Sequence, residues 1–495
     1  MISFLNRIRP ASLIFLVSCS LLSSAEKKPN VLLILVDDLK PTIRSFGDAV
    51  AITPNLDRLA ASGLRFEMAY CNQSVCMASR YNLLLGSRST STGFYNFGTQ
   101  FREVYPDAVT LPQHFMNNGY VAHSMGKIFH IGHGNTNDDA SWSVPHHADK
   151  VIEYVLPESN HRELTREEAL FSNQRSRDEN GSLPRGAAWE APDVLDYAYA
   201  DGRIAETAVD RMRWLKDNEE KPFFLAVGFV RPHLPFSAPK KYWDMYDRNK
   251  LPMPEYVDAP KGAPEYAVKR RGEIMAFNPI PTTEPFPDDL TQQLIHGYYS
   301  SVSYMDAQLG KVLDGLEQQG LADDTIVVLW GDHGWHLGDH GSWTKHSNYE
   351  QANRIPIIIV APGVTKPGSV THQLAETVDI YPTLAALAGL APPKTSQPID
   401  GLDLTPVMLD EQKRIRDYAY HAYSKQGRMG RAIRDSRYRL VEWSNDEEVE
   451  YELYDYQEDP LEMVNIASSN QKALARMQAL LATEPAAKPR VQRRR

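Results

Sequence analysis

Short apolar runs alternate along this chain with longer segments of helical periodicity. Residues 31–36 are all apolar, their number fits a buried strand, and the run stops at two consecutive aspartates. Similar runs predict strands at residues 223–229, 325–330 and 355–360. Strands that alternate with helices indicate an α/β sheet with helices on its faces.

Two helices have clear boundaries in the pattern. Thr53 and Pro54 are typical of a helix start, and Gly63 ends that helix. Residues 298–316 predict an amphipathic helix that stops before Gly320. Its apolar face consists of Val302, Met305, Leu309, Val312 and Leu316. We interpret that face as core packing without chemistry of its own.

The pattern changes in three later parts of the chain. Residues 140–200 and 245–290 are rich in charge, Pro and Gly and have no sustained period, which indicates long insertions around a site. After residue 410, short strands are predicted, followed by a helix through residues 472–481. The strand segments are 418–423, 431–434, 438–443 and 449–454. We therefore predict a main domain over 28–410, a smaller α+β subdomain with an antiparallel sheet over 411–483, and a basic disordered tail over 484–495.

The N-terminus has the features of an export signal. Arg7 and Arg9 precede an apolar stretch over residues 11–22, and residues 23–25 offer a cleavage site of small side chains. The stretch is too short to span a bilayer, and no later segment is long and apolar enough to do so. We predict a signal peptide over residues 1–25 and a periplasmic or secreted protein. Residues 16–19 also resemble a lipoprotein box, so a lipid anchor at Cys19 is the alternative.

Composition narrows the class of partner. The 495 residues are 42% hydrophobic, enough for one large core or two unequal ones. The formal net charge is −10 and becomes −12 when the two leader arginines are removed, which argues against a nucleic-acid partner. Cys71 and Cys76 are the cysteines left after the leader, and a bridge between them would close a tight, strained loop.

Polar pairs follow two of the predicted buried strands. Asp37 and Asp38 follow the first strand, and Asp332 and His333 follow the strand at 325–330. Ligands of open α/β sheets bind at the carboxyl ends of strands, where these carboxylates would repel one another without a cation. Oxygen ligands favour Ca²⁺ or Mg²⁺ over zinc. The alternative is that each pair only caps a helix or a turn.

One cysteine stands at the start of a predicted helix. The free N–H groups and the dipole there favour an anionic group at Cys76. Arg80 follows four residues later, one turn away on the same helix face.

These segments resemble the type I sulfatases of the alkaline-phosphatase-like superfamily, closest to the iduronate-2-sulfatase branch. The resemblance runs from about Asn30 to Ile466. It rests on the segments 30–38, 76–80, 85–86, 126–130, 231–236, 332–340 and 343–345. It implies a large mixed, mostly parallel sheet flanked by helices, with a smaller C-terminal subdomain. At Ala78 the commonest form of the motif has proline, which leaves open which maturing enzyme modifies the chain.

The resemblance also implies the site. Its metal ligands to one Ca²⁺ would be Asp37, Asp38, Cys76, Asp332 and His333, with Cys76 oxidised to formylglycine (3-oxoalanine) by a formylglycine-generating or sulfatase-maturing enzyme. Its catalytic residues would be Cys76, Arg80, Lys127, His130, His233 and Lys345. The hydrate of formylglycine would be the nucleophile, held by Arg80. Lys127 and Lys345 would bind sulfate oxygens. His233 would protonate the leaving oxygen, and His130 would position the hydrate.

The implied activity is hydrolysis of sulfate esters on a sulfated sugar or polysaccharide. A phosphoester or phosphonate hydrolase of the same superfamily is one alternative. A non-catalytic carbohydrate-binding protein that is never matured is another. Without the family resemblance, Lys127 could equally be a surface lysine, and His130 or His233 could be loop histidines.

Overall fold

The computed structural model describes residues 28–176, 178–270 and 272–492. The predicted signal peptide over residues 1–25 and the alternative anchor at Cys19 lie outside these residues. Within them, no helix combines the length and the apolar character that a membrane span requires.

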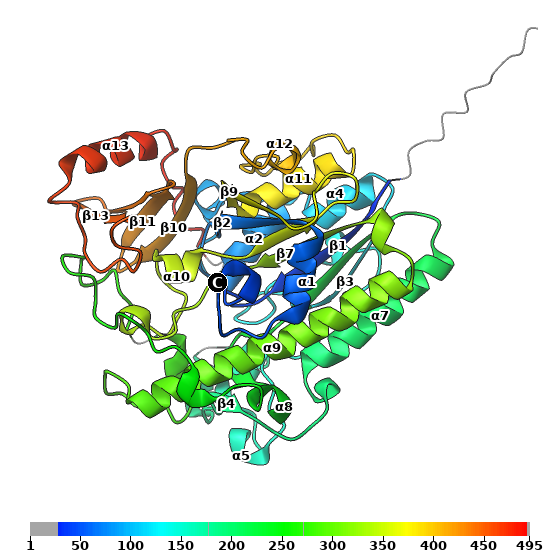
Figure 1. The fold of residues 1–495 in the computed structure, drawn as a ribbon, viewed down its shortest axis with the longest axis horizontal. Helices are drawn as coiled ribbons and strands as arrows, with labels where there is room; N and C mark the ends of the chain where they lie inside the picture. The colour runs from blue at the N-terminus through cyan, green and yellow to red at the C-terminus, as the bar shows by residue number, and fades with distance from the viewer. Residues whose placement is uncertain (1–27, 177, 271, 493–495) are drawn as a thin grey trace, which may run out of the picture.

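A central sheet of seven strands has the spatial order β3-β5-β1-β7-β8-β2-β9 (Figure 1). Neighbouring strands are parallel, except that β8 runs antiparallel to both β7 and β2. The predicted mixed, mostly parallel sheet is confirmed. The strands are β1 (Asn30–Val36), β2 (Leu64–Tyr70), β3 (Val121–Gly126), β5 (Phe223–Phe229), β7 (Thr325–Gly331), β8 (Ile357–Val360) and β9 (Ser369–Glu376).

Helices cover both faces of this sheet, which explains why residues 31–36 of β1 are all apolar. Leu32 and Ile34 pack into the core on one face, with α1, α7 and α9, and Leu33 and Leu35 pack into the core on the other, with α2, α4, α11 and α12. Figure 1 shows α7 and α9 side by side below the central sheet. The bounds are α1 (Pro54–Ser62), α2 (Cys76–Leu85), α4 (Leu111–Asn117), α7 (Ala200–Asn218), α9 (Asp288–Gln318), α11 (Ile380–Leu387) and α12 (Thr405–Leu409).

Seven short α-helices and strands remain in the described residues, and three of them lie in the predicted insertion over residues 140–200. They are α3 (Ser89–Thr92), α5 (Pro157–Asn160), α6 (Arg166–Phe171), α8 (Lys240–Trp243), α10 (Glu350–Asn353), β4 (Trp189–Glu190) and β6 (Phe236–Ser237). The helix predicted over residues 298–316 is the second half of the longer α9. The predicted insertion over 245–290 therefore ends where α9 begins.

A four-stranded antiparallel sheet with the order β10-β11-β12-β13 forms the C-terminal part, covered by α13. The bounds are β10 (Ala419–Lys425), β11 (Arg428–Arg434), β12 (Tyr438–Ser444), β13 (Val449–Asp455) and α13 (Gln471–Leu481). This sheet was predicted from the sequence and is confirmed.

The end of the chain differs from the disordered tail predicted over 484–495. The backbone N–H groups of Lys488 and Val491 donate to the carbonyls of Thr90 and Gly93, at 2.8 and 3.0 Å. Glu484 forms an ion pair with Arg88, at 2.8 Å. The described part of the tail, residues 484–492, is therefore held against the segment that follows α2.

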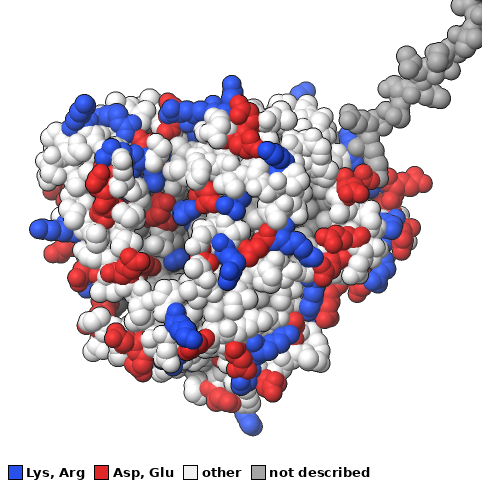
Figure 2. All heavy atoms as spheres, in the orientation of Figure 1, with Lys and Arg blue, Asp and Glu red and all other residues white. Residues whose placement is uncertain are grey.

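The surface carries charges of both signs. On the face drawn in Figure 2, basic and acidic side chains are interspersed over the main sheet and over the C-terminal part.

A buried carboxylate joins the two sheets. Glu376, at the end of β9, forms ion pairs with Arg88 at 2.8 Å and with Arg416, and it accepts the backbone N–H of Tyr420 in β10 at 2.9 Å. Burial would raise the pKa of Glu376, but Arg416 and Arg88 outweigh burial and lower the pKa to about 2. The carboxylate is therefore charged at neutral pH.

Glu376→Gln should destabilise the protein by about 3–5 kcal/mol, because two largely buried guanidinium groups would each lose one of their anionic partners. The matched control is Glu448→Gln, since the side chain of Glu448 is 63% exposed in its ion pair with Arg428 and such pairs contribute within about 1 kcal/mol. Urea unfolding followed by tryptophan fluorescence measures both. Equal losses in the two variants would contradict the coupling role of Glu376.

Candidate functional site

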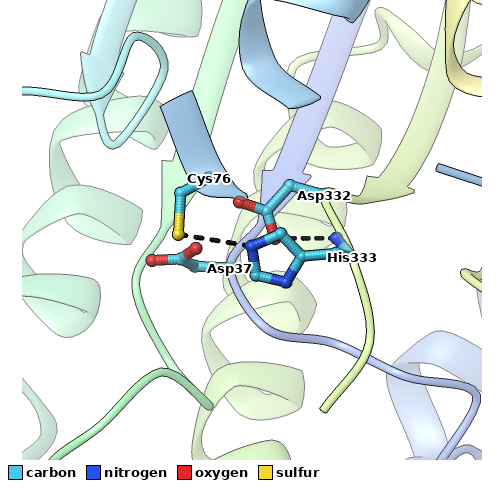
Figure 3. A group of neighbouring side chains, drawn as sticks. All are labelled: Asp37, Cys76, Asp332 and His333. Carbon is cyan, nitrogen blue, oxygen red and sulfur yellow. Dashed lines mark hydrogen bonds and ion pairs between the residues drawn. The ribbon is translucent and has the colours of Figure 1, made fainter. Parts of the chain in front are cut away.

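The site lies at the carboxyl ends of β1 and β7, which are neighbours in the sheet. Val36 and Gly331 pair in register at the ends of these strands, so the residues that follow them meet. The N–H of Asp332 donates to the carbonyl of Val36 at 3.0 Å, and the N–H of Asp38 donates to Asp332 Oδ1 at 3.0 Å. Cys76, the first residue of α2, reaches the same point (Figure 3).

All five predicted metal ligands lie in this cluster. One ligand atom each from Asp37, Cys76, Asp332 and His333 lies within 4.8 Å of all the others, and Asp38, Cys76 and His233 form an overlapping set. His333 Nε2 is 3.2 Å from Cys76 Sγ, and His333 Nδ1 is 3.3 Å from Asp38 Oδ1.

The oxygen donors of the cluster fit a divalent cation. Asp37 Oδ1 and Asp38 Oδ1 are buried and have no hydrogen-bond partner among the described residues. Burial and the neighbouring Asp37 raise the pKa of Asp332 to about 7. Oxygen atoms dominate the set, as Ca²⁺ and Mg²⁺ prefer. The residues present therefore suit a hard cation bound among the three aspartates.

Three buried cations surround the carboxylates, and each is a predicted catalytic residue. Arg80 donates to Asp332 Oδ2 at 3.0 Å and to the carbonyl of Ile128 at 3.2 Å. Lys127 forms an ion pair with Asp37, and Lys345 lies 3.1 Å from Asp38 Oδ1. Each ammonium is thereby tied to one of the two aspartates that follow β1.

The thiol of Cys76 is neutral in this setting. Burial and the adjacent Asp37 raise its pKa well above the usual value, and Lys345 and Lys127 offset this only in part. An unmodified thiol here is a poor nucleophile because the thiolate is the reactive form.

Glu273 is a site residue that the sequence analysis missed. It lies 3.1 Å from His233 Nε2 and 2.6 Å from Lys345 Nζ. Burial would raise the pKa of Glu273, but Lys345 and His233 hold it well below the usual range. Glu273 comes from the insertion over 245–290, where no periodicity or motif marks a single acidic residue as buried.

The two nitrogens of His233 both face acceptors. Nδ1 lies 2.6 Å from the carbonyl of Leu234, and Nε2 faces the carboxylate of Glu273. Each ring nitrogen of His233 therefore has an acceptor nearby to which it can donate when it carries a proton.

His130 has the opposite environment. Its Nε2 lies 3.1 Å from Nδ1 of His133, and its ring packs on Phe97 with centroids 4.6 Å apart. Burial, His133 and Lys127 lower the pKa of His130 well below its usual value. His130 is therefore a neutral imidazole at neutral pH.

A pocket of about 420 Å³ gives access to the cluster. Cys76, His233 and Lys345 are the predicted site residues that line it, together with Glu273 and the aromatic rings of Phe97 and Phe171. Arg80, Lys127 and His130 are not among the described lining residues and are buried. The structure thus brings all predicted site residues together, with three of them facing the pocket.

Two protein families match the chain. The Sulfatase family matches residues 29–390, and the C-terminal family of N-sulphoglucosamine sulphohydrolase matches residues 338–486.

Individual relatives agree with the family match. Human iduronate 2-sulfatase is 34% identical over 74% of this chain and 70% of its own length. Mouse iduronate 2-sulfatase is 31% identical over 91% and 92%, and a sulfatase of Formosa agariphila is 31% identical over 92% and 86%.

Solved structures share the fold. A protein in complex with its substrate D-glucosamine-2-N,6-O-disulfate has a TM-score of 0.69 at 22% identity, covering 92% of this chain and 97% of its own. A phosphonate monoester hydrolase from Silicibacter pomeroyi has a TM-score of 0.71 at 24% identity, covering 92% and 95%. The family match extends over most of the chain, and the close relatives share it along most of their own length. This chain belongs to the sulfatase family of sulfuric ester hydrolases.

Proposed function

We propose that this protein hydrolyses sulfate esters on a sulfated sugar or polysaccharide, using formylglycine formed at Cys76 and one bound Ca²⁺. The observation that carries the proposal is the position of Cys76. Cys76 stands at a helix N-terminus, among three aspartates, and lines a pocket that His233 and Lys345 also line. A sulfate monoester needs positive charge around its oxygens and a proton at the leaving oxygen, and the site offers both.

The proposed metal ligands are Asp37, Asp38, Asp332, His333 and the modified residue 76. When bound, Ca²⁺ would supply the positive charge that polarises the nucleophile and a sulfate oxygen. The proposed catalytic residues are Cys76, Arg80, Lys127, His130, His233 and Lys345.

The cationic residues have separate parts in this proposal. Arg80 is fixed by Asp332 and by backbone carbonyls, so it can hold the group at residue 76 without moving. The ammonium groups of Lys127 and Lys345 would neutralise charge on sulfate oxygens.

The two histidines would move protons in opposite directions. His233, held between Leu234 and Glu273, would donate to the leaving oxygen. His130, a neutral imidazole, would accept a proton from the nucleophile. Their contrasting surroundings support this division of roles.

Substrate class and location are inferred from relatives and from the leader. The matched relatives include iduronate 2-sulfatases, which supports a sulfated uronate-containing saccharide as substrate. The leader predicted over residues 1–25 supports a periplasmic or secreted location, and a sulfatase-maturing enzyme would be the partner that modifies Cys76.

A specific observation favours one second candidate. Phosphonate monoester hydrolases share this fold at TM-scores of 0.71 and 0.69. A phosphonate or phosphate monoester is therefore the alternative substrate.

The tryptic peptide over residues 66–80 should carry formylglycine at position 76 when the protein is made with a maturing enzyme. Cys71 lies in the same peptide and should remain a thiol that alkylation detects, which makes it an internal control. Mass spectrometry measures both positions. An unmodified Cys76 in protein from the native host would favour the non-catalytic carbohydrate-binding alternative.

Removal of calcium should lower both activity and stability. Ligand at one hundred times its Kd stabilises a folded protein by about 2.7 kcal/mol, so chelation should lower the Tm, and calcium should restore it. Asp332→Asn should abolish this calcium response. Asp323→Asn, at the exposed opposite end of β7, should retain it. A Tm that calcium does not change in the unsubstituted protein would refute the metal site.

Sulfate monoesters should be hydrolysed with higher kcat/KM than phosphate or phosphonate monoesters of the same leaving group. A single metal with ammonium groups suits the lower charge of sulfate. Parallel assays at equal pH and calcium concentration decide the comparison. A reversed order would replace the sulfate proposal by the phosphonate one.

A further inference from the structure

The catalytic pocket adjoins a second hollow on the C-terminal sheet. This hollow has a volume of about 430 Å³ and shares Asn96 with the catalytic pocket. Tyr423 of β10 lines the first, and the next residues, Ser424 and Lys425, line the second. The two hollows therefore meet at the end of β10.

The second hollow is basic. Lys425, Arg428 and Arg490 line it, and no Asp or Glu is among its described lining residues. Lys425 and Arg428 are directly opposite each other in the β10–β11 pairing. Like charges in that position destabilise a hairpin. Arg428 is compensated by Glu448, at 2.5 Å.

Lys425 lacks such compensation. Its Nζ is buried and has no hydrogen-bond partner among the described residues. Burial and the nearby Lys269 lower its pKa to about 7, and Glu452 offsets this only in part. Glu452 already accepts the Tyr349 and Tyr454 hydroxyls and the Trp443 indole N–H, at 2.9, 2.6 and 2.6 Å. Among the described residues, no carboxylate therefore forms an ion pair or a hydrogen bond with the Lys425 ammonium, and Glu452 acts on it only in part.

A continuous line of contacts joins this ammonium to the catalytic residues. His346 follows Lys345, its Nδ1 lies 3.0 Å from Lys269 Nζ, and its ring stacks on Tyr423 with centroids 5.8 Å apart. Tyr423 and Lys425 are two positions apart on β10, so their side chains point to the same side of the strand. A chain of sugars that enters the catalytic pocket can therefore continue past Tyr423 to Lys425.

We propose that Lys425, in the hollow that Arg490 also lines, forms an anion subsite for a carboxylate or sulfate on a sugar neighbouring the one that is desulfated. This inference rests on the proposed saccharide substrate. It makes the preferred substrate an oligosaccharide with at least two anionic groups, because the second group would supply the partner that Lys425 lacks.

The test compares a sulfated monosaccharide with a tetrasaccharide that carries the same sulfated sugar at its end and anionic groups on the other sugars. Lys425→Met removes the charge and keeps most of the apolar stem. It should lower kcat/KM for the tetrasaccharide about tenfold more than for the monosaccharide, the loss expected for one charged hydrogen bond. Lys472→Met, the same change at an exposed position of α13, should leave the ratio of the two unchanged. Lys425→Arg keeps the positive charge and should therefore retain most of the preference for the tetrasaccharide over the monosaccharide.

A binding measurement separates this inference from the proposed function. Calorimetry with the tetrasaccharide on the Cys76→Ser background, where turnover is blocked, should show about tenfold weaker binding for Lys425→Met than for Lys472→Met. Equal binding by the two variants, or an equal loss of kcat/KM on both substrates, would overturn the subsite. Binding that depends on Lys425, together with no sulfate release by the matured protein, would instead overturn the proposed function.

Discussion

The burial of opposite charges at one edge of the sheet is the constraint on which the site depends. Register between β1 and β7 brings Asp37, Asp38 and Asp332 together as buried side chains. Charges buried in this way are tolerated only when they are compensated. Arg80, Lys127 and Lys345 provide that compensation, and Asp37 Oδ1 and Asp38 Oδ1, which accept no hydrogen bond from the described residues, can still bind a metal ion. Structural support and proposed chemistry are thus the same set of interactions.

Each compensating group comes from a different part of the chain. Arg80 is on α2, Lys127 follows β3, and Lys345 lies in the segment between β7 and α10. Glu273 comes from an insertion and contacts both His233 and Lys345. Glu273 thus links the proposed proton donor, His233, to the proposed sulfate ligand, Lys345. A substitution at this position of the insertion would change the surroundings of both residues. Variation in such insertions can therefore change the pocket without altering the sheet beneath it.

The C-terminal sheet contributes residues to the catalytic pocket and to the hollow beside it. Glu376 fixes its first strand to β9, and that strand brings Tyr423 to the catalytic pocket and Lys425 to the adjoining basic hollow. A firmly docked sheet can hold such residues in place, because a buried ion pair tolerates little displacement. The contact between Glu376 and β10 therefore supports both the stability of the protein and the positions of Tyr423 and Lys425.

The sequence by itself determined the buried strands that lead to the site, because β1, β5 and β7 are covered on both faces and are therefore almost entirely apolar. Motif resemblance also predicted the residues that meet at their ends, as with Cys76 and Arg80 on one helix face. Strands β2, β3 and β9 escaped prediction because polar residues such as Arg65 and His123 interrupt their apolar pattern. The part played by Glu273, the unpartnered ammonium of Lys425 and the ordered course of residues 484–492 were decided by tertiary structure alone. Each depends on contacts between segments far apart in the chain, and no local periodicity records such contacts.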